Sequence, residues 1–153
     1  MSFDQPSLKG RALRLLSGRE HSRAELERKL ASFEEAPGTL AQALDELQAK
    51  GFINEQRVIE SVVHRRAGKL GTARIKQELQ GKGLDSAAVA EALQGLQATE
   101  RERALAVWRK KFGAPPEDAQ AAAKQMRFLA SRGFGADAIR RVVADADRLI
   151  DED

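Results

Sequence analysis

Apolar residues recur at intervals of three and four along most of the chain, and this spacing places them on one face of an α-helix. Leu26, Leu30 and Phe33 follow it, and so do Ile75 and Leu79. Short stretches, most of them containing glycine, interrupt the pattern eight times. The intervening segments predict nine helices of roughly 10–16 residues each. The strict alternation of a half-buried strand is missing, so the sequence predicts an all-α protein.

Three of the predicted helices end in the same pattern, Leu-x-x-(Lys/Arg)-Gly-(Phe/Leu). In a Schellman motif, the glycine after the helix adopts the left-handed conformation and the next apolar residue packs back onto the last turn. We therefore predict left-handed glycines at Gly51, Gly83 and Gly133. The residues predicted to fold back are Phe52 onto Leu47, Leu84 onto Leu79, and Phe134 onto Leu129.

Capping boxes indicate where several helices begin. A Ser or Thr followed three residues later by Glu or Gln can satisfy two backbone N–H groups at a helix start. Ser22 and Glu25 have this spacing, directly before the first apolar stripe. The same spacing predicts two further boxes, which pair Thr39 with Gln42 and Thr99 with Glu102.

The sequence also repeats with a period of about 50 residues, which is typical of helical arrays. A shift of 49 residues places Leu26 on Ile75, and a further shift of 50 places Leu79 on Leu129. Gln125 is a misfit because it falls opposite Ile75, so a compact helical bundle remains an alternative. We predict tandem repeats of three-helix units that form an elongated, curved array. The predicted repeats are residues 7–53, 54–98 (basic) and 99–150, with flexible termini at 1–6 and 151–153.

Composition limits the compartment and the chemistry. The chain has no cysteine, which excludes disulfides and thiolate metal sites and favours a reducing cytoplasm. Its N-terminus lacks the apolar segment of a signal peptide, and no apolar run approaches the length of about 18 residues needed to span a membrane. Charged residues make up 32% of the chain, which favours a monomer with a polar surface.

The sequence offers little material for a catalytic site. Its only histidines are His21 and His64, and it has no tyrosine. Ser22, next to His21, is better explained as a helix cap than as a nucleophile, and His64 has no histidine or acid three or four residues after it. Trp108 and Phe112 have the spacing of core residues. The glycines near position 70 match no phosphate-binding loop. We expect no enzyme activity, no cofactor and no metal.

Positive charge is concentrated in the middle of the chain. Residues 57–82 hold seven cations and two acids, an excess of five in a chain whose net charge is +3. Such a segment favours a polyanionic or acidic partner, although a solvated basic face explains it equally well. Arg74 and Lys82 are expected to stay exposed while Ile75 and Leu79 are buried. The candidate partner-binding residues are Arg65, Arg66, Lys69, Arg74, Lys76 and Lys82.

Two stretches carry a resemblance to a known family. "REHSRAELERKL" at Arg19–Leu30 and "GFINEQRVIESVVHRRAGKLGTARIKQELQGKGL" at Gly51–Leu84 are similar to the RecX regulatory proteins. The resemblance covers nearly the whole chain and is weaker beyond Thr99. This chain departs from the family pattern at Val58, where an aromatic residue is usual, and at Gly-Thr-Ala before the central helix, where proline is frequent.

The resemblance implies a modulator of the RecA recombinase, typically an inhibitor. It further implies an arc of three-helix repeats that lies in the groove of the RecA–DNA filament and obstructs strand exchange and co-protease activity. The expected partners are therefore the RecA filament and, weakly, single- and double-stranded DNA. The alternatives are a free-standing helical DNA-binding protein or small repressor, and a helical adaptor for another protein.

Overall fold

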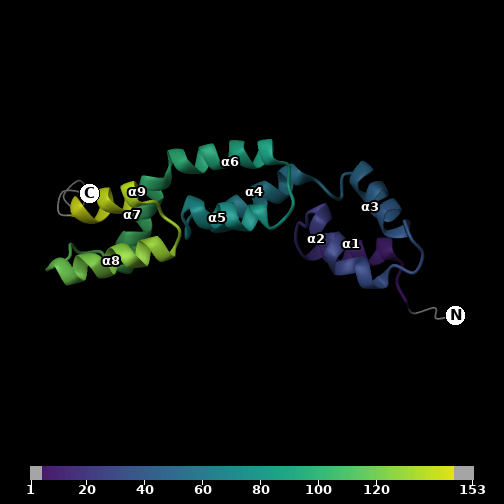
Figure 1. Cartoon of the computed structure of the whole chain (residues 1–153), viewed down its shortest axis with the longest axis horizontal. Coiled ribbons are helices and arrows are strands. Elements are labelled where there is room, and N and C mark those ends of the chain that lie inside the picture. The colour runs from purple at the N-terminus through teal and green to yellow at the C-terminus, as the bar shows by residue number, and fades with distance from the viewer. Residues whose placement is uncertain (1–4, 147–153) are drawn as a thin grey trace.

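The computed structural model describes residues 5–146, and the regular secondary structure in this part of the chain is entirely helical. Figure 1 shows the helices in an elongated, curved row rather than in one bundle. This arrangement confirms the predicted fold class and excludes the compact alternative. The flexible ends were predicted largely for residues outside the described range, at 1–4 and 151–153.

The described residues form nine α-helices of 8–13 residues, somewhat shorter than the sequence predicts. They group into three modules of three helices each. The first module contains α1 (Leu8–Gly18), α2 (Arg23–Leu30) and α3 (Thr39–Ala49), with a short 3₁₀ turn, η1 (Ala31–Phe33). The second contains α4 (Glu55–Arg66), α5 (Thr72–Gln80) and α6 (Ser86–Ala98), and the third contains α7 (Glu100–Lys111), α8 (Ala119–Ser131) and α9 (Ala136–Ala144).

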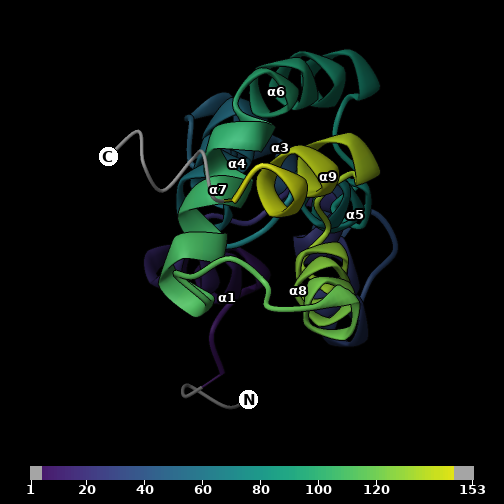
Figure 2. The same ribbon diagram turned by 90° about the vertical axis from the view of Figure 1, so that its left-hand side faces the viewer.

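Within the described residues, each module has its own apolar core. Leu26 and Leu44 are fully buried in the first core, and Ile75 and Leu79 are fully buried in the second. In the third module, α9 lies between α7 and α8, as the end-on view in Figure 2 shows. Each core is small, so the contacts between modules matter for the order of the whole row.

The third core explains the misfit of Gln125 in the repeat. Trp108 is completely buried, and its indole N–H donates to Oε1 of Gln125 at 2.8 Å. A buried indole needs such an acceptor, which an isoleucine at this position would not supply. The Gln125 side chain in turn donates to the carbonyl of Ala114 at 3.3 Å. The predicted core positions of Trp108 and Phe112 are confirmed, with Phe112 half-buried against this cluster.

All three repeated helix ends contain the predicted left-handed glycine. The φ angles of Gly51, Gly83 and Gly133 are 84°, 65° and 93°. The two Schellman hydrogen bonds are complete at Gly51 and Gly133, where the following Phe N–H donates to a leucine carbonyl at 2.9 Å and 3.2 Å respectively. Phe134 is buried, but Phe52 remains 47% exposed. At Gly51 the motif therefore sets the direction of the chain without adding a buried aromatic side chain.

Of the three predicted capping boxes, only the first one forms. The Ser22 hydroxyl accepts the N–H of Glu25 at 3.1 Å, and the Glu25 carboxylate accepts the N–H of Ser22 at 3.0 Å. The prediction for Thr39 is wrong, because α3 begins after Gly38 and the Thr39 hydroxyl donates to the carbonyl of Ala36. A hydroxyl close to a free carbonyl can bond to it instead of capping the helix.

The prediction for Thr99 is wrong for the same reason. Its hydroxyl donates to the carbonyl of Leu96 at 3.3 Å and accepts a bond from Arg103. Arg103 donates five hydrogen bonds, which also reach the carbonyls of Ala67 and Leu70 and the hydroxyl of Thr72. Burial lowers the pKa of this guanidinium, although the Glu100 charge opposes the shift. Arg103 thus fastens the start of α7 to the turn before α5.

The second and third modules meet through helix ends. The carbonyls of Arg132 and Gly133, at the end of α8, accept the N–H groups of Gly71 and Ala73 at 2.7 Å and 3.2 Å. Groups that single helices leave unsatisfied are therefore paired across the junction. The backbones approach so closely that a Cβ on Gly71 would overlap the backbone of Gly133, and one on Gly133 would overlap Arg74.

A buried carboxylate completes this junction. Glu100 is only 4% exposed, and its Oε1 accepts the N–H of Thr72 at 2.8 Å. Its Oε2 accepts the N–H of Gly135 at 3.4 Å. One anion therefore lies at the N-terminal ends of α5 and α9, where the positive end of each helix dipole favours it.

The glycine contacts predict a difference between two otherwise similar substitutions. Gly51→Ala should lower the free energy of unfolding by about 1–2 kcal/mol, because only the left-handed conformation is penalised there. Gly133→Ala should cost at least about 2 kcal/mol more, since its methyl group would also collide with Arg74. Urea unfolding followed by circular dichroism measures both. Equal losses would show that the close approach at Gly133 is unimportant.

Candidate interaction surface

The predicted basic residues lie along one part of the second module. We call the set Arg65, Arg66, Lys69, Arg74 and Lys76 the basic face, in which Arg74 and Lys76 leave α5 on opposite sides of the buried Ile75. Arg65 and Arg66 end α4, Lys69 lies in the following turn, and Arg74 and Lys76 are on α5. All but the half-buried Arg66 are exposed.

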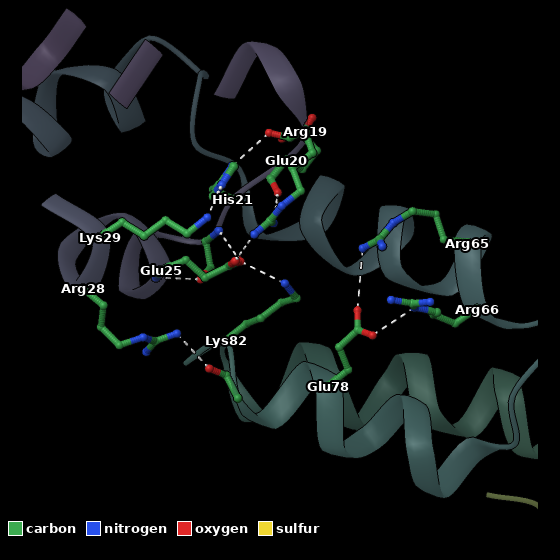
Figure 3. A network of polar contacts seen from close by, with 12 residues as sticks. Arg19, Glu20, His21, Glu25, Arg28, Lys29, Arg65, Arg66, Glu78 and Lys82 are labelled. Atoms are coloured by element: carbon green, nitrogen blue, oxygen red, sulfur yellow. Dashed lines mark hydrogen bonds and ion pairs between the residues drawn. The ribbon is translucent and has the colours of Figure 1, made fainter. Parts of the chain in front are cut away.

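One carboxylate pairs with two members of the basic face. Glu78 lies 3.0 Å from Nε of Arg66 and 3.6 Å from Nη2 of Arg65. Figure 3 shows both guanidinium groups converging on this side chain. The single negative charge offsets only half of the pair, so the surface keeps an excess of positive charge.

Arg74 is fixed by the neighbouring module. Its Nη1 donates to the carbonyl of Ser131 at 2.7 Å, near the end of α8. Its aliphatic part covers Gly133. The guanidinium therefore has a defined position at the junction of the second and third modules, although the residue is exposed.

Lys82 does not belong to the exposed surface, contrary to the sequence prediction. Its side chain is only 11% exposed, and Nζ lies 3.0 Å from Oε1 of Glu25 in the first module. The helix α5 ends at Gln80, so Lys82 leaves the helical face on which it was placed and turns toward α2. Reversing its charge would place two carboxylates together in a buried position, so Lys82→Glu is expected to destabilise the protein.

Glu25 is the centre of this first junction, as Figure 3 shows. Besides Lys82, it accepts from Arg19 at 2.8 Å and from the backbone of Ser22. Burial alone would raise the pKa of its carboxyl, but the hydrogen bonds from Arg19, Ser22 and Lys82 outweigh burial and hold the pKa at about 2. The glutamate was predicted only as a helix cap, and its link between two modules was missed.

Other contacts at the first junction also come from long side chains. Arg28 donates to the carbonyl of Gly81 at 3.0 Å. Arg57 of the second module pairs with Glu20 at 2.9 Å. Gly83 lies so close to α2 that a Cβ on it would come within 2.8 Å of the Ala24 methyl group. This junction therefore relies on long charged side chains, whereas the junction of the second and third modules also contains two direct backbone hydrogen bonds.

The two histidines have no catalytic arrangement. His21 is buried, its Nδ1 lies 3.0 Å from the Arg19 carbonyl and its Nε2 lies 3.3 Å from Nζ of Lys29. Burial lowers the pKa of His21, which favours a neutral ring beside that lysine. Ser22 caps α2, and His64 is exposed as predicted. Within residues 5–146, no cluster of three or more acidic or histidine side chains is placed to hold a metal ion.

An open groove lies where the basic face meets the third module. Arg132, the residue after α8, lines it together with three members of the basic face, Arg66, Lys69 and Arg74. In the sequence, Arg132 stands out only as the cation before Gly133 in the repeated helix-end pattern. Only the tertiary structure shows that Arg132 also lines this groove, because residues 66–74 and 132 are far apart along the chain.

Comparison with known proteins gives the family of the chain. Models of the first, second and third three-helix domains of RecX match residues 9–47, 54–93 and 99–143. The chain belongs to the RecX family. The matches follow the chain in the family's own order, one for each module of the structure.

Full-length relatives agree with this assignment. "Regulatory protein RecX" of Leptothrix cholodnii is 54% identical over 149 residues, which cover 97% of this chain and 95% of the relative. The RecX protein of Pseudomonas putida is 38% identical and covers 95% of both chains. Among solved structures, RecX from Lactobacillus salivarius has a TM-score of 0.74 at 23% identity, over 92% of this chain and 95% of that one. That likeness supports the fold.

The α-helices of the described range are 8–13 residues long. None of them is long and apolar enough to cross a membrane.

The Glu25 cluster predicts a specific loss of stability in acid. A carboxyl with a folded pKa of about 2 and an ordinary pKa of 4.5 stabilises the folded state by about 3 kcal/mol at neutral pH. The benefit is present above about pH 4.5 and is lost as the pH falls toward about 2. Glu25→Gln should therefore reduce the free energy of unfolding at neutral pH, and the difference from the native chain should shrink over this acid range.

Urea unfolding at a series of pH values measures this effect. The matched control is Glu27→Gln on the same helix, where the carboxylate is exposed and pairs with Arg23. Its effect should be small at every pH. If the Glu25 and Glu27 variants behave alike, the buried ion pairs do not hold the first junction.

Proposed function

We propose that this chain is a non-enzymatic regulator that binds in the groove of the RecA–DNA filament. It modulates, and mainly inhibits, strand exchange, ATP hydrolysis and co-protease activity of RecA in DNA repair. Its three repeats, residues 7–53, 54–98 and 99–150, act together as one elongated ligand. The observation that carries the proposal is a row of three RecX modules with its basic face at the centre.

The shape supports binding to an extended partner. Each module keeps its own core, so the chain presents more length than a single compact domain of equal mass. The junctions hold the row in a defined curve before binding occurs. Such preorganisation lowers the entropy cost of contacting a long groove.

The charge supports a nucleoprotein partner. The basic face stays largely exposed, and Glu78 neutralises only part of it. Exposed charges contribute less than about 1 kcal/mol each to affinity, but together they speed association with an anionic surface. Their effect falls as salt concentration rises.

Inhibition by occupancy requires no catalytic group. In this chain Ser22 and His21 make structural contacts within the first module, which is consistent with a regulator rather than a hydrolase. The relatives are named regulatory proteins, which also supports this class of function.

The decisive test measures RecA-driven strand exchange and single-strand-dependent ATP hydrolysis with increasing amounts of this protein. Both rates should fall in a dose-dependent way. If saturating protein leaves both unchanged while it still binds DNA, the chain is a free-standing DNA-binding protein instead.

A second experiment tests the basic face. Lys69→Glu combined with Lys76→Glu should raise the concentration needed for half-inhibition about tenfold, because both positions are exposed and four unit charges change in total. The control is Lys110→Glu with Lys124→Glu, which makes the same change of charge at exposed positions of the third module. Equal inhibition by the two variants would remove the basic face from the mechanism.

A further inference from the structure

The first module has a surface of a different kind, which combines apolar and cationic side chains. Arg11, Arg14 and Leu15 lie three and four residues apart on α1, so they share one face of that helix. Residues from the end of α2 and from η1 complete an open pocket with a cavity volume of about 200 Å³. We call this the anchor pocket, and its lining residues are Arg11, Arg14, Leu15, Lys29, Leu30 and Phe33.

Three of these side chains are apolar. Leu30 is buried and Leu15 is half-buried, and both belong to the core cluster of the first module. Phe33 is 44% exposed and, with Phe52, is one of the two large apolar side chains that stay exposed within residues 5–146. An exposed ring beside a concave apolar floor can take up an apolar side chain from another molecule.

The other three side chains are cations without a carboxylate partner in the part of the chain that the structure describes. The ion pairs of the first module are formed by other residues, and α1 has no acidic residue. The Arg11 guanidinium lies 3.9 Å from the centre of the Phe33 ring, and Nζ of Lys29 lies 3.3 Å from Nε2 of His21. Neither contact supplies a negative charge, so the rim of the pocket attracts anions.

A more polar hollow adjoins the anchor pocket and shares Arg11 and Phe33 with it. Ser7 and Ser32 contribute to its lining. Glu35 is the one carboxylate in this lining, so the cations remain in excess across both hollows. A bound chain can therefore continue past the anchor pocket over a polar surface.

We propose that the anchor pocket binds a short acidic segment of a partner protein. One apolar side chain of that segment inserts against Leu15, Leu30 and Phe33, and its flanking carboxylates pair with the three cations of the rim. The proposal goes beyond the proposed function and does not rest on it. The pocket lies on the first module, at one end of the row, and includes no residue of the basic face (Figure 1).

The lining favours such a segment over other anions. A cavity of about 200 Å³ is smaller than a typical site for a drug-sized ligand, but it can hold one apolar side chain. Arg11 already lies over the Phe33 ring, so that face of the ring offers no platform for a nucleobase. A phosphate backbone would gain nothing from the apolar floor, whereas protein interfaces combine an apolar anchor with a polar rim.

Fluorescence anisotropy with two labelled peptides tests the proposal on the whole protein without RecA. The anchored peptide is "EDDEFDEDE", and the serine peptide is "EDDESDEDE", which has the same charge. The anchored peptide should bind about tenfold more tightly at equal salt, because only the contacts of the phenylalanine differ. Equal affinities would overturn the proposal, since electrostatic attraction alone would then explain the binding. This comparison uses the native chain and does not depend on the folding of any variant.

Two variants separate the rim of the pocket from its apolar wall. Arg14→Gln with Lys29→Gln removes two rim charges, and glutamine keeps an N–H donor near His21. Its affinity for the anchored peptide should fall about tenfold at low salt, and the loss should shrink as salt rises. Phe33→Ala should remove most of the preference for the anchored peptide over the serine peptide. Retention of that preference in Phe33→Ala would place the anchor elsewhere and overturn the proposal.

The matched control for the rim is Lys110→Gln with Lys124→Gln, which removes two exposed charges from the third module. It should bind the anchored peptide as the native chain does. Equal losses in the two double variants would overturn the proposal, because only net charge would then matter. Displacement of the anchored peptide by single-stranded DNA of equal charge more readily than by unlabelled peptide would also overturn it, since the surface would then select phosphates.

Discussion

The structure depends on the satisfaction of helix ends between modules. Every helix leaves backbone donors at its start and acceptors at its end, and short helices have a large share of such groups. At the junction of the second and third modules, the end of α8 meets the start of α5, so orphan carbonyls and N–H groups pair with one another. Gly71 and Gly133 permit this contact because neither has a side chain, and Glu100 supplies a further buried acceptor. Modules with small cores thereby become one extended body.

Different kinds of contact hold the two junctions between the modules. Between the first and second modules, Glu25 gathers Arg19 and Lys82, and the contacts come mainly from long charged side chains. Between the second and third, two backbone hydrogen bonds act together with bonds from the side chains of Arg103, Arg74 and the buried Glu100. Ion pairs respond to salt and acid, whereas backbone hydrogen bonds respond little. The ion pairs of Glu25 with Lys82 and of Glu20 with Arg57 join the first module to the second, so its placement is expected to respond to salt and acid.

The candidate surface could be predicted only in part. Arg74 is exposed beside the buried Ile75, as its helical spacing predicts. Lys82 was placed on that face by helical periodicity, but α5 ends before it and the side chain pairs with Glu25. Arg132 also lines the groove, although it is far from the basic face in the sequence. Thr39 and Thr99 failed as caps because nearby carbonyls compete for a hydroxyl, and one-dimensional spacing does not show which acceptor lies closer.

The amino-acid sequence by itself determined the helical class, the repeat of about fifty residues and the left-handed glycines at helix ends, because each depends on interactions between near neighbours. It also placed the net excess of positive charge in the middle of the chain. Tertiary structure alone decided which buried carboxylates join the modules, which cations stay exposed and how Gln125 fits a core beside Trp108. Those outcomes depend on contacts between residues far apart in sequence, whose geometry appears only when the helices pack.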